Sequence, residues 1–320
     1  MAPTTRKRKL DEEKAAPDAV PAETPSKKVK PQKSGKSGQT EDTDESDKNT
    51  ESFEVPYGDK SIICKKYFTI QEHAKGRKKA TTPSLIFTHG AGGGIETPAT
   101  VDLARGFARL DTVLCFQGTM NLKSRIKSFH TVIEDQEWGQ ALGGRSMGAR
   151  AAVMTANEYG KTEALVLVSY PLLSEKGDIR DEILLEIPAN VAVLFVSGDG
   201  DKMCPFDQLS DVRKRMKATS WLVLVKGADH GMDVKPKSAT EPVRRETGSV
   251  AARWLKQRDS KKLEVLIEWS QDDQKIVMTD WHDHSSVTSP EQKMDSIEQT
   301  EQNEGKDQGS RPKSRRKKRS

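Results

Sequence analysis

The chain has 320 residues, of which 33% are hydrophobic and 32% are charged; a folded domain normally contains about 45–50% apolar residues, so we expect part of the chain to be disordered. The net charge is +5, but the last ten residues carry seven basic residues and no acidic one, which leaves −2 for residues 1–310 and gives no indication that the folded part binds nucleic acid. No run of about 18 apolar residues is present, which excludes a membrane-spanning helix.

Residues 1–51 consist mainly of Lys, Glu, Asp, Ser, Thr and Pro, without the apolar segment that a secretory signal requires. We expect disorder here, because such a segment cannot bury enough apolar surface to offset the entropy of ordering. Basic clusters at residues 6–9 and 27–30, and a third within a polar, disordered tail over 285–320, are typical of nuclear import signals and of weak contacts with nucleic acid. We predict a nuclear or a nuclear and cytoplasmic location; the alternative is that these ends only keep the chain soluble.

One folded unit is expected over residues 52–260, where short apolar runs alternate with segments of helical period. Runs rich in Val and Leu are typical of strands that are buried on both faces, and their alternation with helices predicts an α/β fold with a mostly parallel, doubly wound sheet. We expect strands at residues 62–64, 85–87, 112–116, 164–168, 191–196 and 221–225, and helices at 100–108, 123–132, 147–159, 206–217 and 240–256.

The most informative motif is G-R-S-M-G at residues 144–148, which matches the G-x-S-x-G nucleophile elbow of α/β hydrolases. In that elbow the serine lies on a sharp turn between a strand and a helix, and small neighbours allow the two elements to approach. A short strand over 138–143 and a helix rich in alanine on the other side provide this setting. Ser146 is therefore the candidate nucleophile.

A serine hydroxyl needs a general base, and in this fold the chain order is serine, acid, histidine. His230 is the histidine that comes after the serine and follows a core strand, whereas the others precede the serine or lie in polar segments. Asp199 and Asp201 both follow the strand over 191–196, so the residues leave either as the acid. All of these positions come at the carboxyl ends of strands, where open α/β sheets place their sites.

The glycine-rich loop T-H-G-A-G-G-G follows the strand at 85–87. We expect it to supply one backbone N–H to an oxyanion hole, most plausibly from Ala91, and the residue after the nucleophile, Met147, to supply the other. The phosphate-binding and dinucleotide-binding loop patterns are both absent, so no cofactor is expected.

Further features are assigned no catalytic role. The segment over 261–284 has the pattern of a β-hairpin with an Asp-rich turn. His282 and His284 lack a second pair of ligands, so no metal site is expected. We expect Arg145 to pair with an acidic loop rather than to contact a substrate. The three cysteines, Cys64, Cys115 and Cys204, form no disulfide framework and indicate a reducing compartment.

Four strings, H-G-A-G-G, L-G-G-R-S-M-G-A-R, S-G-D-G-D and A-D-H-G, together resemble one group of α/β hydrolases. This group contains testis-expressed protein 30 and subunit 3 of the nuclear NSL histone-acetyltransferase complex, and is distantly related to dienelactone hydrolases. The resemblance covers residues 84–255 and implies a domain without a lid, with Ser146, Asp201 and His230 at the triad positions. Residues 116–121 depart from the pattern of the group, which implies a different substrate pocket.

Two functions are compatible with these observations. One is a serine hydrolase, like an esterase or a thioesterase, that acts on a small acyl substrate without contact with a membrane. About twenty residues separate the strands at 164–168 and 191–196, too few for a helical lid, so the site is expected to be open. The other, which the resemblance and the basic ends favour, is an interaction subunit of a nuclear, chromatin-associated complex with little or no catalysis.

Overall fold

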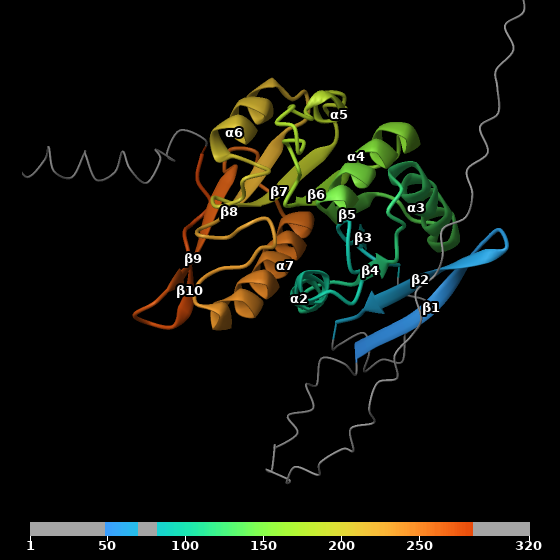
Figure 1. Ribbon diagram of the computed structural model, residues 1–320, viewed down its shortest axis with the longest axis horizontal. Helices are drawn as coiled ribbons and strands as arrows, with labels where there is room; N and C mark the ends of the chain where they lie inside the picture. Colours follow the sequence, from blue (N-terminus) through green and yellow to red (C-terminus); the bar gives the residue numbers. More distant parts are fainter. Residues whose placement is uncertain (1–48, 70–81, 284–320) are drawn as a thin grey trace, which may run out of the picture. The chain divides into compact units, whose positions relative to one another are not determined.

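The computed structural model describes residues 49–69 and 82–283 (Figure 1). The three basic clusters and almost all of the two segments expected to be disordered lie outside these residues. Within the described ranges, no helix is long and apolar enough to cross a membrane.

Ten strands form one sheet in the order β1-β2-β4-β3-β5-β6-β7-β8-β9-β10. The seven strands from β4 to β9 in this order are parallel, and β1, β2 and β10 are antiparallel to their neighbours. Central strands such as β6 are buried along their whole length, which explains their continuous Val and Leu content. The strands are β1 (Thr50–Tyr57), β2 (Lys60–Tyr67), β3 (Leu85–Thr88), β4 (Val113–Phe116), β5 (Ala141–Arg145), β6 (Ala164–Val168), β7 (Ala192–Gly198), β8 (Ser220–Val225), β9 (Glu264–Ser270) and β10 (Lys275–Met278).

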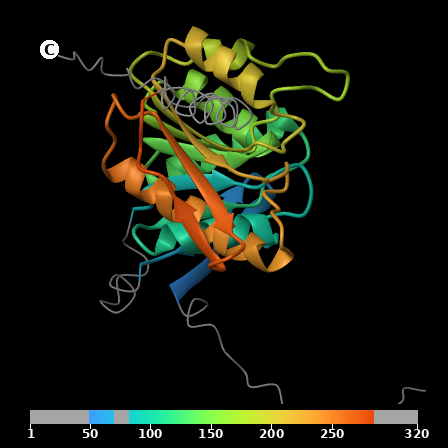
Figure 2. The ribbon, with the colours of Figure 1, turned by 90° about the vertical axis from the view of Figure 1, so that its left-hand side faces the viewer.

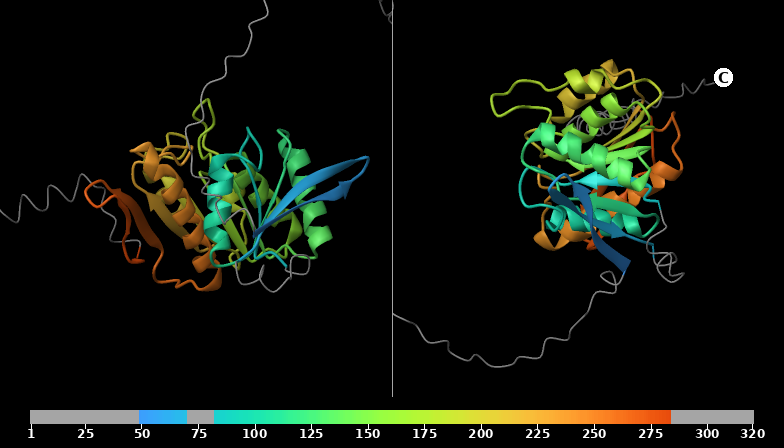
Figure 3. Two further views of the ribbon diagram at one scale, coloured as in Figure 1. Left: turned by 90° about the horizontal axis from the view of Figure 1, so that it is seen from below. Right: turned by 90° about the vertical axis from the view of Figure 1, so that its right-hand side faces the viewer.

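Helices cover both faces of this sheet (Figures 2 and 3). Side chains of α3, α4 and α6 pack in the hydrophobic cluster on one face, and those of α2 and α7 pack in the cluster on the other. The helices are α2 (Pro98–Ala108), α3 (Leu122–Gln136), α4 (Met147–Tyr159), α5 (Glu182–Leu185), α6 (Phe206–Arg215), the 3-10 turn η2 (Lys237–Ala239) and α7 (Thr240–Lys256). The prediction of a mostly parallel, doubly wound α/β sheet is confirmed, and each expected strand and helix overlaps one of these elements.

The helices α2 and α7 cross at a contact between their backbones. A Cβ atom on Gly106 would lie 1.8 Å from the carbonyl oxygen of Arg245, and one on Gly248 would lie 2.1 Å from that of Leu103. Only glycine fits at these two positions. The close packing of α2 and α7 bears on the site, because Arg244 of α7 contacts the loop after β8.

The folded part begins earlier than expected. β1 starts at Thr50, inside the segment predicted to be disordered, and pairs with β2 over its full length. Val55 is its single buried residue, so this strand has no apolar run by which it could be recognised. Pairing of its backbone with β2 stabilises it instead.

The expected hairpin over 261–284 is present as β9 and β10, and it is part of the main sheet. β9 pairs with β8 in parallel, so the boundary predicted at residue 260 does not separate two structural units. A buried ion pair between Arg213 of α6 and Glu264 of β9, with an N–O distance of 2.5 Å, links the hairpin to the core. Arg213 also donates to the hydroxyl and carbonyl oxygens of Ser220.

Candidate active site

Ser146 lies on the sharp turn between β5 and α4, with φ 51° and ψ −117°. A residue other than glycine rarely adopts a positive φ. Such a conformation persists only where tight packing around the turn holds it. A Cβ atom on Gly144 would lie 2.3 Å from the carbonyl carbon of Gly148, and one on Gly148 would lie 2.5 Å from the carbonyl oxygen of His89. The two glycines of the motif therefore let α4 start directly against β5 and the loop after β3.

The structure brings the three predicted triad residues together. The Ser146 Oγ lies 2.9 Å from His230 Nε2, and His230 Nδ1 lies 2.9 Å from Asp201 Oδ2. Asp201 is 2% exposed, and its Oδ1 accepts a hydrogen bond from the N–H of Met203. Asp199 points elsewhere, because its Oδ1 accepts from the N–H of Gly227. Of the two open candidates, Asp201 is the carboxylate that contacts the histidine.

The loop that carries His230 is held by two arginines from different elements. Arg145, the residue before Ser146, donates from Nη2 to the carbonyl oxygen of His230 at 2.7 Å. Burial lowers the pKa of Arg145. Arg145 therefore lies against an acidic loop, as expected: the charges of Asp229 and Asp233 on this loop oppose the lowering of its pKa, but its contact is a backbone carbonyl and not an ion pair.

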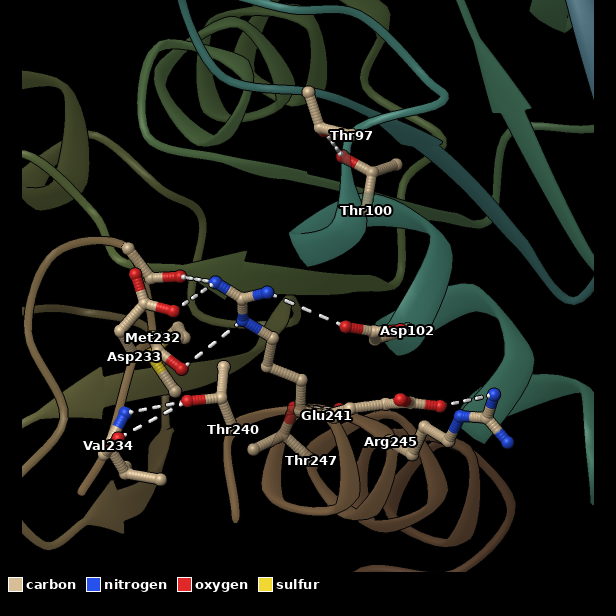
Figure 4. Close-up of polar contacts among 12 residues, drawn as sticks. Thr97, Thr100, Asp102, Met232, Asp233, Val234, Thr240, Glu241, Arg245 and Thr247 are labelled. Carbon is tan, nitrogen blue, oxygen red and sulfur yellow. Dashed lines mark hydrogen bonds and ion pairs between the residues drawn. The ribbon is translucent and has the colours of Figure 1, made fainter. Parts of the chain in front are cut away.

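The second arginine is Arg244 of α7. It donates to the carbonyl oxygens of Gly231 and Met232, at 2.9 and 3.2 Å, and pairs with the carboxylate of Asp233 at 2.7 Å. The carboxylate of Asp102, on α2, lies 3.5 Å from Nη1 of the same guanidinium. Figure 4 shows Asp102 on one side of this cluster and Met232 and Asp233 on the other. Burial raises the pKa of Asp102, and the charge of Arg244 opposes that shift. Arg145 and Arg244 together therefore hold the carbonyl oxygens of three consecutive residues, from His230 to Met232.

Of the two predicted oxyanion donors, Met147 directly follows Ser146, and Ala91 follows a residue that packs against Ser146. Met147 is the first residue of α4, so its N–H has no acceptor within the helix. Ala91 follows Gly90, and a Cβ atom on Gly90 would lie 3.6 Å from the Cβ atom of Ser146. The glycine-rich loop therefore packs against the nucleophile, as its position after β3 predicts.

Two residues under this loop were not assigned a role from the sequence. His89 is 2% exposed and contacts the carbonyl oxygen of Gly90 through Nδ1, at 2.7 Å. Arg125 of α3 is fully buried and donates to the carbonyl oxygens of His89 and Gly90. His89 stands in the H-G-A-G-G string and could have been noticed there, whereas Arg125 gave no signal.

The segment over 116–121, where the sequence departs from the group that it resembles, supports the same loop. Gln117 Oε1 accepts from the N–H of Ile95 at 3.1 Å, and the N–H of Gly118 donates to His89 Nε2 at 3.0 Å. Both ends of the glycine-rich loop are therefore tied to the connection between β4 and α3.

The cysteines and the distal histidines form no second reactive centre in the described residues. All three cysteines are free and buried, and burial raises the pKa of Cys204 to about 12. Such a thiol stays protonated at neutral pH and is a poor nucleophile. No group of three or more His, Cys, Asp or Glu residues in the described ranges could hold a metal ion; His284 lies outside them.

Comparisons with known proteins agree with this architecture. A family model described as an alpha/beta hydrolase domain matches residues 119–255, which is less than half of the chain. The structure of dienelactone hydrolase from Anabaena variabilis is 15% identical, covers 65% of this chain and 98% of its own, and superposes with a TM-score of 0.50. Est1E from Butyrivibrio proteoclasticus is 16% identical over 62% of this chain and 99% of its own, with a TM-score of 0.48. At 15% identity the Anabaena structure shows the fold alone, and the resemblance to the narrower group stays a prediction.

Proposed function

The folded part of this chain is an α/β-hydrolase domain, and we propose that it is a serine hydrolase acting on an ester or thioester of a small acyl group. One observation carries the proposal: the continuous contact from Ser146 through His230 to the buried carboxylate of Asp201. A serine hydroxyl with an imidazole on one side, itself held by a carboxylate, is the arrangement that activates a serine nucleophile.

In the proposed reaction, Ser146 Oγ forms a bond to the carbonyl carbon of the substrate, and its proton passes to His230 Nε2. The carbonyl electrons move to the oxygen, which the N–H groups of Ala91 and Met147 stabilise as an anion. Collapse of this intermediate breaks the bond to the leaving alcohol or thiol, which takes the proton from His230. Water then attacks the acyl-enzyme by the same steps, which releases the acid and restores Ser146. Asp201 holds His230 in the tautomer that carries its proton on Nδ1.

The proposed preference for small acyl groups follows from the connection between β6 and β7. In the described residues the one helix of this connection is α5, which has four residues, so the connection forms no helical lid. A site without a lid offers little apolar surface for a long acyl chain, whose burial would otherwise contribute about 0.8 kcal/mol per methylene.

The second candidate is an interaction subunit of a nuclear complex with little or no catalysis. The basic clusters at residues 6–9, 27–30 and 315–319 favour it, as does the resemblance to a group that contains a subunit of the NSL complex. The same clusters support a nuclear location and weak contacts with nucleic acid. A scaffold has no physical need for the contacts between Ser146, His230 and Asp201, and we therefore place it second.

The test is labelling of the full chain with a fluorophosphonate probe, with Ser146→Ala as the control. We expect the wild type to be labelled and the variant not, and we expect p-nitrophenyl esters to be hydrolysed faster as the acyl chain becomes shorter. Absence of labelling in the wild type contradicts the proposal. Co-purification in a stable complex, combined with absence of labelling, would favour the scaffold.

A further inference from the structure

A buried arginine lies under the glycine-rich loop without a carboxylate beside it. Arg125 is fully buried, and it donates from Nη1 to the carbonyl oxygen of Gly90 at 3.1 Å and to that of His89. Its Nε donates to the carbonyl oxygen of Thr119 at 2.9 Å. Among the described residues no carboxylate pairs with it. Burial lowers the pKa of Arg125 to about 10, so the side chain is still a cation at neutral pH.

His89 holds the same peptide from a second direction. His89 Nε2 lies 3.0 Å from the nitrogen and 3.1 Å from the carbonyl oxygen of Gly118, and Nδ1 lies 2.7 Å from the carbonyl oxygen of Gly90. A proton on Nδ1 satisfies the shorter contact, because a carbonyl oxygen can only accept, and it leaves Nε2 to accept from the N–H of Gly118. Gly118 is needed for this arrangement, since a Cβ atom there would lie 2.5 Å from Arg125 Nε. The connection between β4 and α3 thus leaves room for the arginine and fixes the tautomer of the histidine.

These contacts determine where the neighbouring N–H groups point. In a trans peptide the C=O and the N–H of the next residue are nearly antiparallel. Since the C=O of Gly90 points to Arg125 and His89, the N–H of Ala91 points to the opposite side of the loop. The C=O of His89 also points to Arg125, so the N–H of Gly90 takes the same opposite direction. Gly90 itself packs against Ser146.

We propose that Arg125 and His89 are positioning residues that orient the N–H of Ala91 toward the oxyanion, and that the uncompensated charge of Arg125 adds to the stabilisation of that anion. The inference rests on the proposed function, because it assigns a role within the same site. It also explains why an arginine is buried here although burial of an unpaired charge is costly: its donors satisfy carbonyls of a loop that must keep one conformation.

The test compares binding of the ground state with binding of an intermediate analogue. A trifluoromethyl ketone with the acyl group of the best ester substrate adds Ser146 Oγ to its carbonyl carbon, the hydroxyl proton moves to His230, and the carbonyl oxygen becomes the anion. For Arg125→Met we expect kcat to fall about 10²-fold, as for the loss of one oxyanion donor. The inhibition constant of the ketone should rise by a similar factor, while KM changes by less than about threefold. Arg125→Lys, which keeps the charge and one donor, should show a smaller change in both.

Controls separate this role from a general loss of structure. Arg213→Met removes another buried arginine, on α6 and away from the loop, and should lower the unfolding midpoint without changing the inhibition constant per active site. If Arg125→Met does not fold, Arg125→Lys and His89→Ala carry the test. Folded variants with an unchanged inhibition constant overturn the inference and leave the hydrolase proposal intact. A wild type that reacts with neither the ketone nor the fluorophosphonate overturns both.

Discussion

Two loops meet at Ser146, and each is held from behind by an arginine of a helix, but the two arginines differ in how their charge is balanced. Arg244, behind the loop of His230, lies between the carboxylates of Asp102 and Asp233. Arg125, under the glycine-rich loop, donates to carbonyl oxygens and pairs with no carboxylate among the described residues. In the proposed reaction the first loop holds the general base, whereas the second faces the developing anion. A compensated arginine suits the former, and an uncompensated one suits the latter.

The difference also predicts opposite responses to pH. Burial raises the pKa of Asp102 above its ordinary value, so its contribution to stability is fully present at low pH and is lost as the pH rises through the raised pKa. Burial and the charge of Arg125 lower the pKa of His89 to about 4, so its contribution has the opposite sign. The two groups therefore contribute to stability with opposite signs as the pH changes.

The largest effect is expected from the acid of the triad. Asp201→Asn should preserve the fold but lower kcat by up to about 10⁴-fold, because an amide no longer holds His230 in the tautomer that accepts the proton of Ser146. Asp199→Asn is the matched control, since Asp199 contacts the N–H of Gly227 and not the histidine. Hydrolysis of a p-nitrophenyl ester measures both. A larger loss of kcat in Asp199→Asn than in Asp201→Asn would mean that Asp199 is the acid.

The second-largest effect is expected from replacing Arg244, whose charge is balanced by carboxylates. Arg244→Met should lower the free energy of unfolding by about 3–5 kcal/mol, because it leaves the buried carboxylate of Asp102 without its partner. Adding Asp102→Asn should recover part of that loss, which urea denaturation of both single variants and the double variant would show. No carboxylate substitution should rescue Arg125→Met in this way. If the losses in the free energy of unfolding of Arg244→Met and Asp102→Asn simply add in the double variant, Asp102 does not compensate Arg244. The distinction between the two arginines would then be wrong.

A third effect concerns acid stability. The unfolded chain binds a proton at His89 near pH 6.5 and the native chain only near pH 4, so the wild type should lose about 3 kcal/mol of stability through this residue as the pH falls across that window. His89→Gln should be less stable at pH 7 but should show a flatter dependence on pH. Denaturation curves between pH 4 and 7 would show this. His130→Gln, on the outer side of α3, provides the control, and an equal flattening there would contradict the assignment to His89.

Most of the sheet and the set of triad residues could be predicted, because both depend on local patterns. Strands such as β6 are continuous apolar runs, and the order of Ser146, an aspartate and His230 is a property of the chain alone. The residues alone left Asp199 and Asp201 open, since both follow β7, and only the resemblance implied Asp201; the contact with His230 depends on the shape of one loop. Arg125 could not be recognised, because it lies in an amphipathic helix and its contacts with the glycine-rich loop join residues 35 and 36 positions apart.

The smallest effect sharpens the same comparison within a single cluster. Asp233 and Asp102 both contact Arg244, but the side chain of Asp233 is 57% exposed and that of Asp102 only 9%. An exposed ion pair is screened by water and typically contributes less than about 1 kcal/mol. Asp233→Asn should therefore change the free energy of unfolding by less than about 1 kcal/mol, and this small change should disappear in high salt. Urea denaturation at two salt concentrations measures it. A loss as large as that of Arg244→Met would mean that Asp233, and not the buried carboxylate, compensates the arginine behind the loop of the base.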